Sequence, residues 1–197
     1  MKIIIVIIVL GLMTCPSVFA GELLDSGQIH ALCRNVVSLD HETQQNAVAS
    51  ISRLPPSVIP AFAALLNTES EAEDVRSGAA VALGIFGATA RSYIPDLARA
   101  LNGISISLSQ SAAGSLSDLV NQTDSAVVPA LVCRLVNRRP DCSFECYWSI
   151  TALGKIGPSA REALPVLRQI VGDRRVSSAI QAEAQKSIEL IETVSNP

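Results

Sequence analysis

One phrase recurs four times in this sequence in the same register. An apolar residue precedes a proline, and further apolar residues follow two and six positions after that proline. The prolines at positions 60, 95, 129 and 165 are 35, 34 and 36 residues apart. A fixed period of this size predicts a stack of two-helix units, because no single unit can bury its apolar face alone. The copies are Ile59-Pro60…Phe62…Leu66, Ile94-Pro95…Leu97…Leu101, Val128-Pro129…Leu131…Leu135 and Leu164-Pro165…Leu167…Val171.

The proline phrase belongs to the first helix of each pair. Ser57, Ser92 and Ser125 stand three or four residues before their prolines, which suits helix N-caps followed by proline in the first turn. Pro165 lies six residues after Ser159. The fourth of these helices therefore either starts later or bends at its proline.

The second helix of each pair is rich in small residues and ends near a glycine. The clearest copy runs from Val75 to Gly87, and its end returns as Ala152-Leu153-Gly154-Lys155-Ile156-Gly157. We expect the small residue at Gly84 to allow close helix packing, and Gly87 and Gly157 to end their helices.

The two ends of the array are weaker copies. The last copy has Glu189 and Glu192 where internal copies have glycine, as expected of a terminal unit whose outer face meets water. At the other end, Ile29…Leu32…Val36 fits the first-helix spacing, with His30 at the proline position. We therefore predict one all-α domain over residues 21–197, built from five helix pairs near 21–54, 55–88, 89–122, 123–157 and 158–194.

The second-helix motif also carries a family resemblance. Together with the proline-marked first helix, Asp74-Val75-Arg76-x-x-Ala79-Ala80-x-Ala82-Leu83-Gly84-x-x-Gly87 resembles the HEAT repeat, in the short form of phycocyanobilin-lyase-like proteins. The resemblance implies a right-handed α-solenoid whose second helices line the concave side. The sequence does not fit two other repeat families. A tetratricopeptide array has its proline at the end of the second helix, and an ankyrin array needs Thr-Pro-Leu-His, which is absent here. The motif indicates the fold and hardly bears on function.

Residues 1–20 have the pattern of a secretory signal peptide. Met1-Lys2 gives a short positive start, the segment from Ile3 to Met13 is apolar apart from one glycine, and small residues lead to a cleavage site between Ala20 and Gly21. The sequence therefore predicts an exported protein, periplasmic or secreted. One alternative is an uncleaved N-terminal anchor, although the run is shorter than the about 20 residues that a membrane span needs. The other is lipidation at Cys15, because the preceding residues loosely resemble a bacterial lipobox.

The charge of the chain argues against nucleic acid as a partner. Without Lys2, 14 basic residues face 18 acidic ones, a net charge of −4. The basic clusters are only Arg138-Arg139 and Arg174-Arg175, whereas nucleic-acid binding calls for a basic stripe.

Enzymatic chemistry has little support in the sequence. Some HEAT-repeat enzymes, the deoxyhypusine hydroxylases, bind two irons through several His-Glu pairs, but this chain has one such pair, His41-Glu42, and one other histidine, His30. We expect His41 to lie at a solvated helix start capped by Asp40 or Thr43, and we predict no metal and no cofactor. A bilin-lyase-like activity is implied only at the level of the repeat, and an exported chain is in the wrong compartment for phycobilisome assembly.

Four cysteines remain after signal cleavage. Cys33 takes an apolar first-helix position, which predicts a buried free thiol. The other three lie in the fourth pair, where a Cys133–Cys142 disulfide would staple the turn between the helices. A Cys142–Cys146 disulfide is the rival if Cys142 precedes the helix. Unpaired thiols and a metal or redox role are the remaining alternatives.

The candidate partner-binding residues lie on second helices. Tyr147 and Trp148 stand where the second pair has Ser77 and Gly78, so they either project as interface anchors or, for Trp148, pack between second helices. The other candidates are Glu73 and Arg76, the latter being expected also to link repeats. We predict a non-catalytic exported module that binds a protein or peptide on the concave ridge of second helices. An envelope assembly or membrane-tethered structural factor is the alternative, and membrane contact is expected only with an uncleaved signal or a lipidated Cys15.

Overall fold

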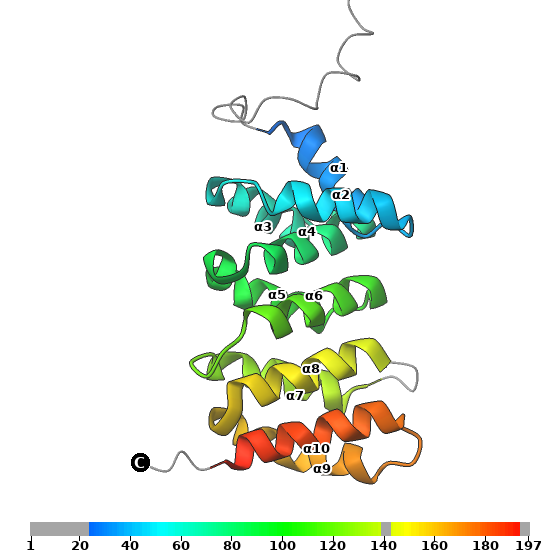
Figure 1. Ribbon diagram of the computed structural model, residues 1–197, viewed down its shortest axis with the longest axis vertical. Coiled ribbons are helices and arrows are strands. Elements are labelled where there is room, and N and C mark those ends of the chain that lie inside the picture. Colours follow the sequence, from blue (N-terminus) through cyan, green and yellow to red (C-terminus); the bar gives the residue numbers. More distant parts are fainter. Residues whose placement is uncertain (1–23, 139–142, 194–197) are drawn as a thin grey trace, which may run out of the picture.

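The computed structural model describes residues 24–138 and 143–193, which form α-helices and 3₁₀ turns in one continuous stack (Figure 1). The predicted signal peptide, its cleavage site at Ala20 and Gly21, Cys15 and Cys142 lie outside the described residues. The all-α solenoid and its five helix pairs are confirmed. The α-helices are α1 (Ser26–Val36), α2 (His41–Ile51), α3 (Ile59–Asn67), α4 (Glu73–Ile85), α5 (Ile94–Leu101), α6 (Ile106–Leu119), α7 (Val128–Val136), α8 (Ser143–Ile156), α9 (Leu164–Gly172) and α10 (Ser178–Glu192).

Each of the four phrase prolines is the second residue of its helix, in α3, α5, α7 and α9. The predicted serine caps are wrong, because Ser57, Ser92 and Ser125 lie inside 3₁₀ turns that run directly into these helices. Such a turn makes its own backbone bonds, for example from Val58 N to the Pro55 carbonyl, and proline has no N–H that needs a cap. Of the two alternatives for Pro165, the later start of its helix is confirmed, because α9 begins at Leu164.

The second helices α4, α6, α8 and α10 stack side by side, and α3, α5, α7 and α9 form the other row. Close contact within the second-helix row is made at glycine, as predicted. A Cβ on Gly84 would lie 2.7 Å from Ser115 Oγ of α6, and a Cβ on Gly154 would lie 2.7 Å from Ser187 Oγ of α10. Both serine hydroxyls donate to a carbonyl of the preceding second helix, at 2.8 and 3.0 Å. The repeat therefore reuses one glycine–serine contact.

The glycines that follow α4 and α8 adopt the left-handed backbone conformation predicted for helix ends. Gly87 has φ of +56° and Gly157 has φ of +64°. Only glycine takes such angles without steric cost, so the chain can turn sharply there into the 3₁₀ segment that leads to the next first helix.

The first pair is arranged differently from the others. α1, not α2, packs along α4 and extends the second-helix row, and α2 packs mainly on α1. The contact with α4 is a backbone contact, because a Cβ on Gly78 would lie 1.8 Å from the Cys33 carbonyl oxygen. The sequence assigned α1 to the first-helix row on its apolar spacing. That spacing shows which face is buried but not which neighbour buries it.

Candidate binding surface

One stripe of α8 faces solvent. Phe144, Tyr147, Trp148, Thr151 and Lys155 follow each other at helical spacing and are half-buried or exposed, whereas the positions between them are buried. Phe144 is the most open of the apolar side chains here, with 59% of its surface exposed. This stripe runs along the outside of the second-helix row, with α6 on one side and α10 on the other.

Three rings of this stripe form an aromatic cluster, which we define as Phe144, Tyr147 and Trp148. The ring centroids of Tyr147 and Trp148 are 5.1 Å apart with planes at 85°, and those of Phe144 and Trp148 are 6.1 Å apart at 65°. Edge-to-face pairs of this kind stabilise a fixed arrangement. Tyr147 and Trp148 are half-buried and pack partly against the core; their role as interface anchors stays a prediction. Phe144 was not among the predicted residues, although its spacing of four residues from Trp148 places both on one helix face.

Small and polar side chains flank the aromatic cluster on both neighbouring helices. On α6, Gln110 and Ser111 are half-buried, and a Cβ on Gly114 would meet no atom within 4 Å. On α10, Glu183 Oε1 accepts a hydrogen bond from Thr151 Oγ1 at 3.0 Å. The rings therefore lie beside smaller side chains. The carboxylate of Glu183 bonds to Thr151, which lies one helical turn after Trp148.

The positions that correspond to Tyr147 and Trp148 are covered at the N-terminal end of the row. Ser77 and Gly78, which take the positions of Tyr147 and Trp148 in α4, are both buried. α1 lies against Gly78 through the backbone of Cys33. The two positions that carry rings in α8 are therefore covered in α4, whereas Glu73 and Asp74 of α4 are exposed.

The predicted candidates Glu73 and Arg76 do not pair with each other. Arg76 is half-buried, and its Nε donates to the Leu66 carbonyl at the end of α3 at 3.1 Å. Glu73 is exposed and accepts a hydrogen bond of 2.6 Å from Ser105, the N-cap of α6. Arg76 thus joins the two helices of its own pair, and Glu73 joins α4 to the next second helix.

A buried ion pair involves Glu145, the residue that follows Phe144 of the aromatic cluster. Arg134 Nη2 in the last turn of α7 donates to Glu145 Oε1 in the first turn of α8 at 2.6 Å, with side-chain exposures of 7% and 1%. Gln110 Nε2 of α6 lies 3.5 Å from the other carboxylate oxygen. Together with Gln110, the pair connects α6, α7 and α8 and fixes the start of α8.

The sequence contained a signal for this ion pair that comparison of the repeats reveals. Arg134 lies five residues after its phrase proline, where the second pair has Leu65. Glu145 lies nine residues before Gly154, where the second pair has Val75 nine residues before Gly84. One base and one acid in normally apolar positions of the same pair predict that they meet, because unpaired buried charges are very costly.

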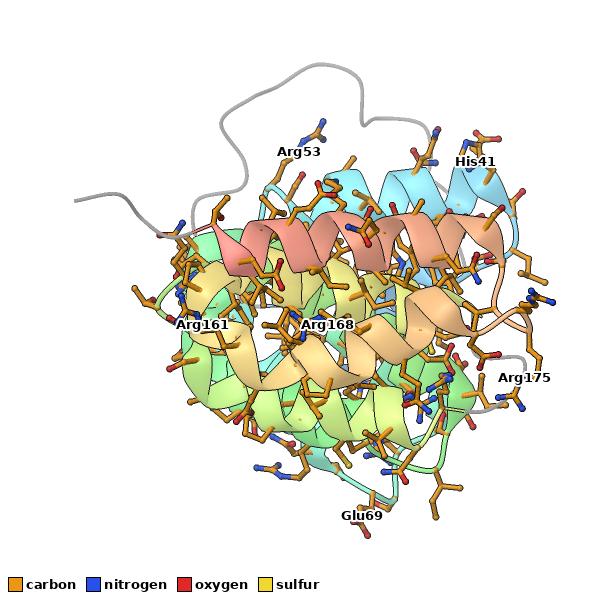
Figure 2. The ribbon with its side chains drawn as sticks, turned by 90° about the horizontal axis from the view of Figure 1, so that it is seen from below. His41, Arg53, Glu69, Arg161, Arg168 and Arg175 are labelled. Carbon is orange, nitrogen blue, oxygen red and sulfur yellow. The ribbon has the colours of Figure 1, made fainter. Side chains whose placement is uncertain are left out.

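The two histidines have structural partners away from the aromatic cluster. His30 Nδ1 lies 2.6 Å from the Ser26 carbonyl and its Nε2 lies 3.2 Å from Glu71 Oε2. The bond to the Ser26 carbonyl and that to Glu71 raise the pKa of His30. His41 bonds to Gln45 at the start of α2, on the outside of the molecule (Figure 2), and Asp40 caps this helix as predicted.

The structure confirms the prediction for Cys33 and contradicts the predicted Cys133–Cys142 disulfide. Cys33 is a buried free thiol, as predicted, and burial raises its pKa to about 12. Cys133 is an exposed free thiol, so the Cys133–Cys142 disulfide is wrong. Its sulfur lies instead 3.3 Å from Asn137 Nδ2, one turn further along. The rival Cys142–Cys146 pairing stays a prediction, because Cys142 lies outside the described residues.

The described part of the chain has neither a single membrane-spanning helix nor a cluster of three metal-binding side chains. No single helix there is long and apolar enough to cross a membrane, and one pair, α2 with the segment Pro56–Asn67 bent by 106°, meets the requirement by length and composition only. Within residues 24–138 and 143–193, no three His, Cys, Asp or Glu side chains gather as metal ligands would.

No protein-family model and no curated protein matches the sequence. Solved structures do match. The complex of CpcE and CpcF of phycocyanin lyase from Nostoc sp. PCC7120 is 24% identical with a TM-score of 0.60, over 89% of this chain and 68% of that chain. A designed armadillo repeat protein in complex with the peptide (KR)4 is 16% identical with a TM-score of 0.57, over 84% of this chain and 82% of that chain. These likenesses show a HEAT/armadillo-like helical repeat fold.

Proposed function

We propose that this HEAT/armadillo-like helical repeat chain is an exported, non-catalytic module that binds a protein or peptide partner on its second-helix row. The observation that carries the proposal is the aromatic cluster of Phe144, Tyr147 and Trp148, which stands on a rigid helix with one ring 59% exposed. Tyrosine and tryptophan are the residues that most often dominate binding at interfaces. A rigid row of packed helices also loses little conformational freedom on binding.

A partner-binding role is favoured over catalysis because both histidines are engaged in hydrogen bonds and the Cys33 thiol is buried. The histidines are engaged with Ser26, Glu71 and Gln45, and the Cys33 thiol is buried with a raised pKa. The open face carries rings, amides and hydroxyls together with Lys155 and Glu183. Structural neighbours that bind a peptide or assemble as a complex support a protein or peptide as the class of partner.

The export part of the proposal rests on residues 1–20. N-terminal sequencing of the mature chain tests it, with a start at Gly21 expected. A blocked or lipidated start at Cys15, or an intact Met1, would instead support the membrane-tethered alternative. We further propose a Cys142–Cys146 disulfide, since Cys133 is a free thiol and Cys146 is not; peptide mapping without reduction tests this pairing.

Position-specific photo-crosslinking tests the binding surface. A photoreactive phenylalanine analogue at Phe144 is expected to give one dominant adduct in the native compartment. The same analogue at Arg99, whose side chain is 69% exposed on α5 of the other row, is the matched control and should not give it. The adduct should also disappear in a Tyr147→Ala/Trp148→Ala variant that keeps its helical circular dichroism.

An identical adduct from both positions, or one that survives the double substitution, would contradict the proposal. Either result would mean that the partner binds elsewhere on the stack or that the contact does not depend on the cluster.

A further inference from the structure

The turns that join the two helices of each pair lie along one edge of the stack, and the turns between pairs lie along the opposite edge (Figure 1). We call the first the turn edge; its described residues are 37–40, 68–72, 102–105, 137–138 and 173–177. Of the seven exposed large apolar side chains in the described residues, five lie in or beside it: Leu39, Ile104, Ile106, Val136 and Phe144. The described turns between pairs carry none. Such one-sided exposure marks a contact surface.

The turn edge is acidic around the α3–α4 turn. Glu69 and Glu73 are exposed there. Glu71 lies 3.2 Å from His30, which adds positive charge only when protonated. Four acids and two arginines leave a net charge of −2 in this region. They are Glu69, Glu71, Glu73 and Asp74 against Arg34, which lies 3.6 Å from Asp74, and the half-buried Arg76.

The turn edge is basic around the α7–α8 and α9–α10 turns. Asp173 is shared by Arg138, at 3.0 Å, and by Arg175, at 2.9 Å. Arg174 is exposed, and 88% of the Arg175 side chain is exposed. The buried ion pair between α7 and α8 is neutral as a pair. Three arginines and one acid therefore leave a net charge of +2 among the described residues of these turns.

The α5–α6 turn separates the acidic end from the basic end. Its residues 102–105 include no charged side chain, and 94% of the surface of Ile104 is exposed there. The second helices follow each other in the order α4, α6, α8 and α10. The turn edge therefore changes from acidic through apolar to basic along the stack.

We propose that the turn edge binds a second copy of this chain, with the two copies antiparallel about a two-fold axis near the α5–α6 turn. A two-fold contact has to be complementary to itself. The turn edge meets this condition, because rotation about its middle places the acidic end of each copy against the basic end of the other. The same rotation brings the two Ile104 side chains together near the axis.

A second copy fits this edge better than a partner of one charge sign. A surface of uniform charge would attract one end of the edge and repel the other, whereas a second copy satisfies both ends at once. The inference goes beyond the proposed function, because it concerns the turn edge and not the second-helix row. Its failure would leave the proposed function untouched.

Sedimentation velocity of the mature chain over a range of concentrations tests the proposal. The mass should rise from that of a monomer to that of a dimer, and the dimer should weaken as salt screens the charges. Arg174→Glu/Arg175→Glu makes both ends acidic and should weaken the dimer at least about tenfold. The matched control Arg53→Glu/Arg161→Glu, on the side of the stack opposite Arg175 (Figure 2), should leave the dimer unchanged.

A charge exchange separates lost attraction from misfolding. Glu69→Arg/Glu73→Arg makes the acidic end basic and should also weaken self-association. An equimolar mixture of this variant with Arg174→Glu/Arg175→Glu should recover the dimer, because each copy again meets the opposite charge at both ends. Circular dichroism confirms that each variant is folded.

A cysteine at the expected axis tests the geometry. In a Cys133→Ser background, which removes the exposed native thiol, Ile104→Cys should oxidise to a disulfide-linked dimer, whereas Arg161→Cys on the opposite edge should not. Three results would overturn the inference: a monomer up to about millimolar concentration, a mixture of the two charge variants that stays monomeric, or equal crosslinking at positions 104 and 161.

Discussion

The second and fourth helix pairs share one sequence pattern and use it differently. Both have a proline as the second residue of the first helix, a close-packing glycine and a glycine of positive φ after the second helix. The fourth pair departs from the second by an ion pair in two apolar positions and by two rings in two small positions. In the second pair, Gly78 is covered by α1, and Ser77 is buried with its hydroxyl 3.1 Å from that of Ser107 in α6.

This difference separates what the repeat must keep from what it can change. The positions of Gly84 and Gly154 stay small in both pairs, because an added Cβ would strike a serine of the next second helix. Positions on the solvent-facing stripe are free to change, and in the fourth pair they gather the aromatic cluster. The four predictions that follow test this separation, in order of decreasing effect.

The largest contrast is between the thiols of α1 and α7. Cys33 is buried against α4 of the second pair and its pKa is raised to about 12, so its thiolate is roughly a thousandfold scarcer at neutral pH than that of an ordinary thiol. Cys133 is exposed. Alkylation followed by peptide mass spectrometry should label Cys133 at least about a thousandfold faster than Cys33 in the folded protein.

The control for the thiols is Cys133→Ser, which should remove the fast phase while unfolding in denaturant exposes Cys33. Equal labelling rates of the two cysteines in the folded chain would show that α1 does not stay packed on α4.

Removal of one partner of the buried ion pair should lower the free energy of unfolding, whereas replacement of both partners by the residues of the second pair should not. Glu145→Ala leaves Arg134 buried without its partner and should lower the free energy of unfolding by about 3–5 kcal/mol. Arg134→Leu/Glu145→Val, which installs the residues of the second pair, should be neutral or stabilising. Nε of Arg134 has no hydrogen-bond partner in the described structure, so the native pair is incompletely satisfied.

Urea unfolding of the single and double variants measures this effect. A double variant as unstable as Glu145→Ala would mean that the fourth pair cannot accept the apolar solution of the second, and that its packing differs more than the shared pattern indicates.

Gly78→Ala tests the covered end of the row. Its Cβ would lie 1.8 Å from the Cys33 carbonyl oxygen, so α1 has to shift and the protein should lose about 3 kcal/mol, at the upper end of overpacking costs. Gly114→Ala is the matched control on the open part of the row, where a Cβ meets no atom within 4 Å. It should be neutral or stabilise by about 0.4–1 kcal/mol, and thermal unfolding of both variants makes the comparison.

The smallest effect concerns His30, which joins α1 to Glu71 in the α3–α4 turn. Its pKa is raised in the folded protein by the bonds to the Ser26 carbonyl and Glu71. Its contribution to stability is therefore fully present below the unfolded pKa and is lost as pH rises through the folded pKa. His30→Gln should cost less than about 1 kcal/mol at about pH 5.5 and less still at about pH 8.5; a greater loss at the higher pH would show that the neutral ring is the stabilising form.

Much of the fold was predictable because it depends on contacts that recur. The proline phrase predicted four pairs and the apolar spacing Ile29…Leu32…Val36 a fifth, and the glycines at 84, 87 and 157 predicted the close contacts and helix ends that the structure has. The serine caps failed for a local reason, since serine also suits turns and only backbone geometry distinguishes a cap from a 3₁₀ turn. In the candidate site, Tyr147 and Trp148 were predicted from their departure from small residues, whereas Phe144 was missed.

The sequence by itself determined which face of each helix is buried and where each helix begins or ends near a proline or glycine, because these depend on neighbours within a few residues. Only the tertiary structure decided that α1 packs on α4, that Arg134 meets Glu145, and that Cys133 stays a free thiol. Those outcomes depend on which distant segments come into contact. An apolar stripe or a charge specifies the chemistry of its partner but not the helix that supplies it.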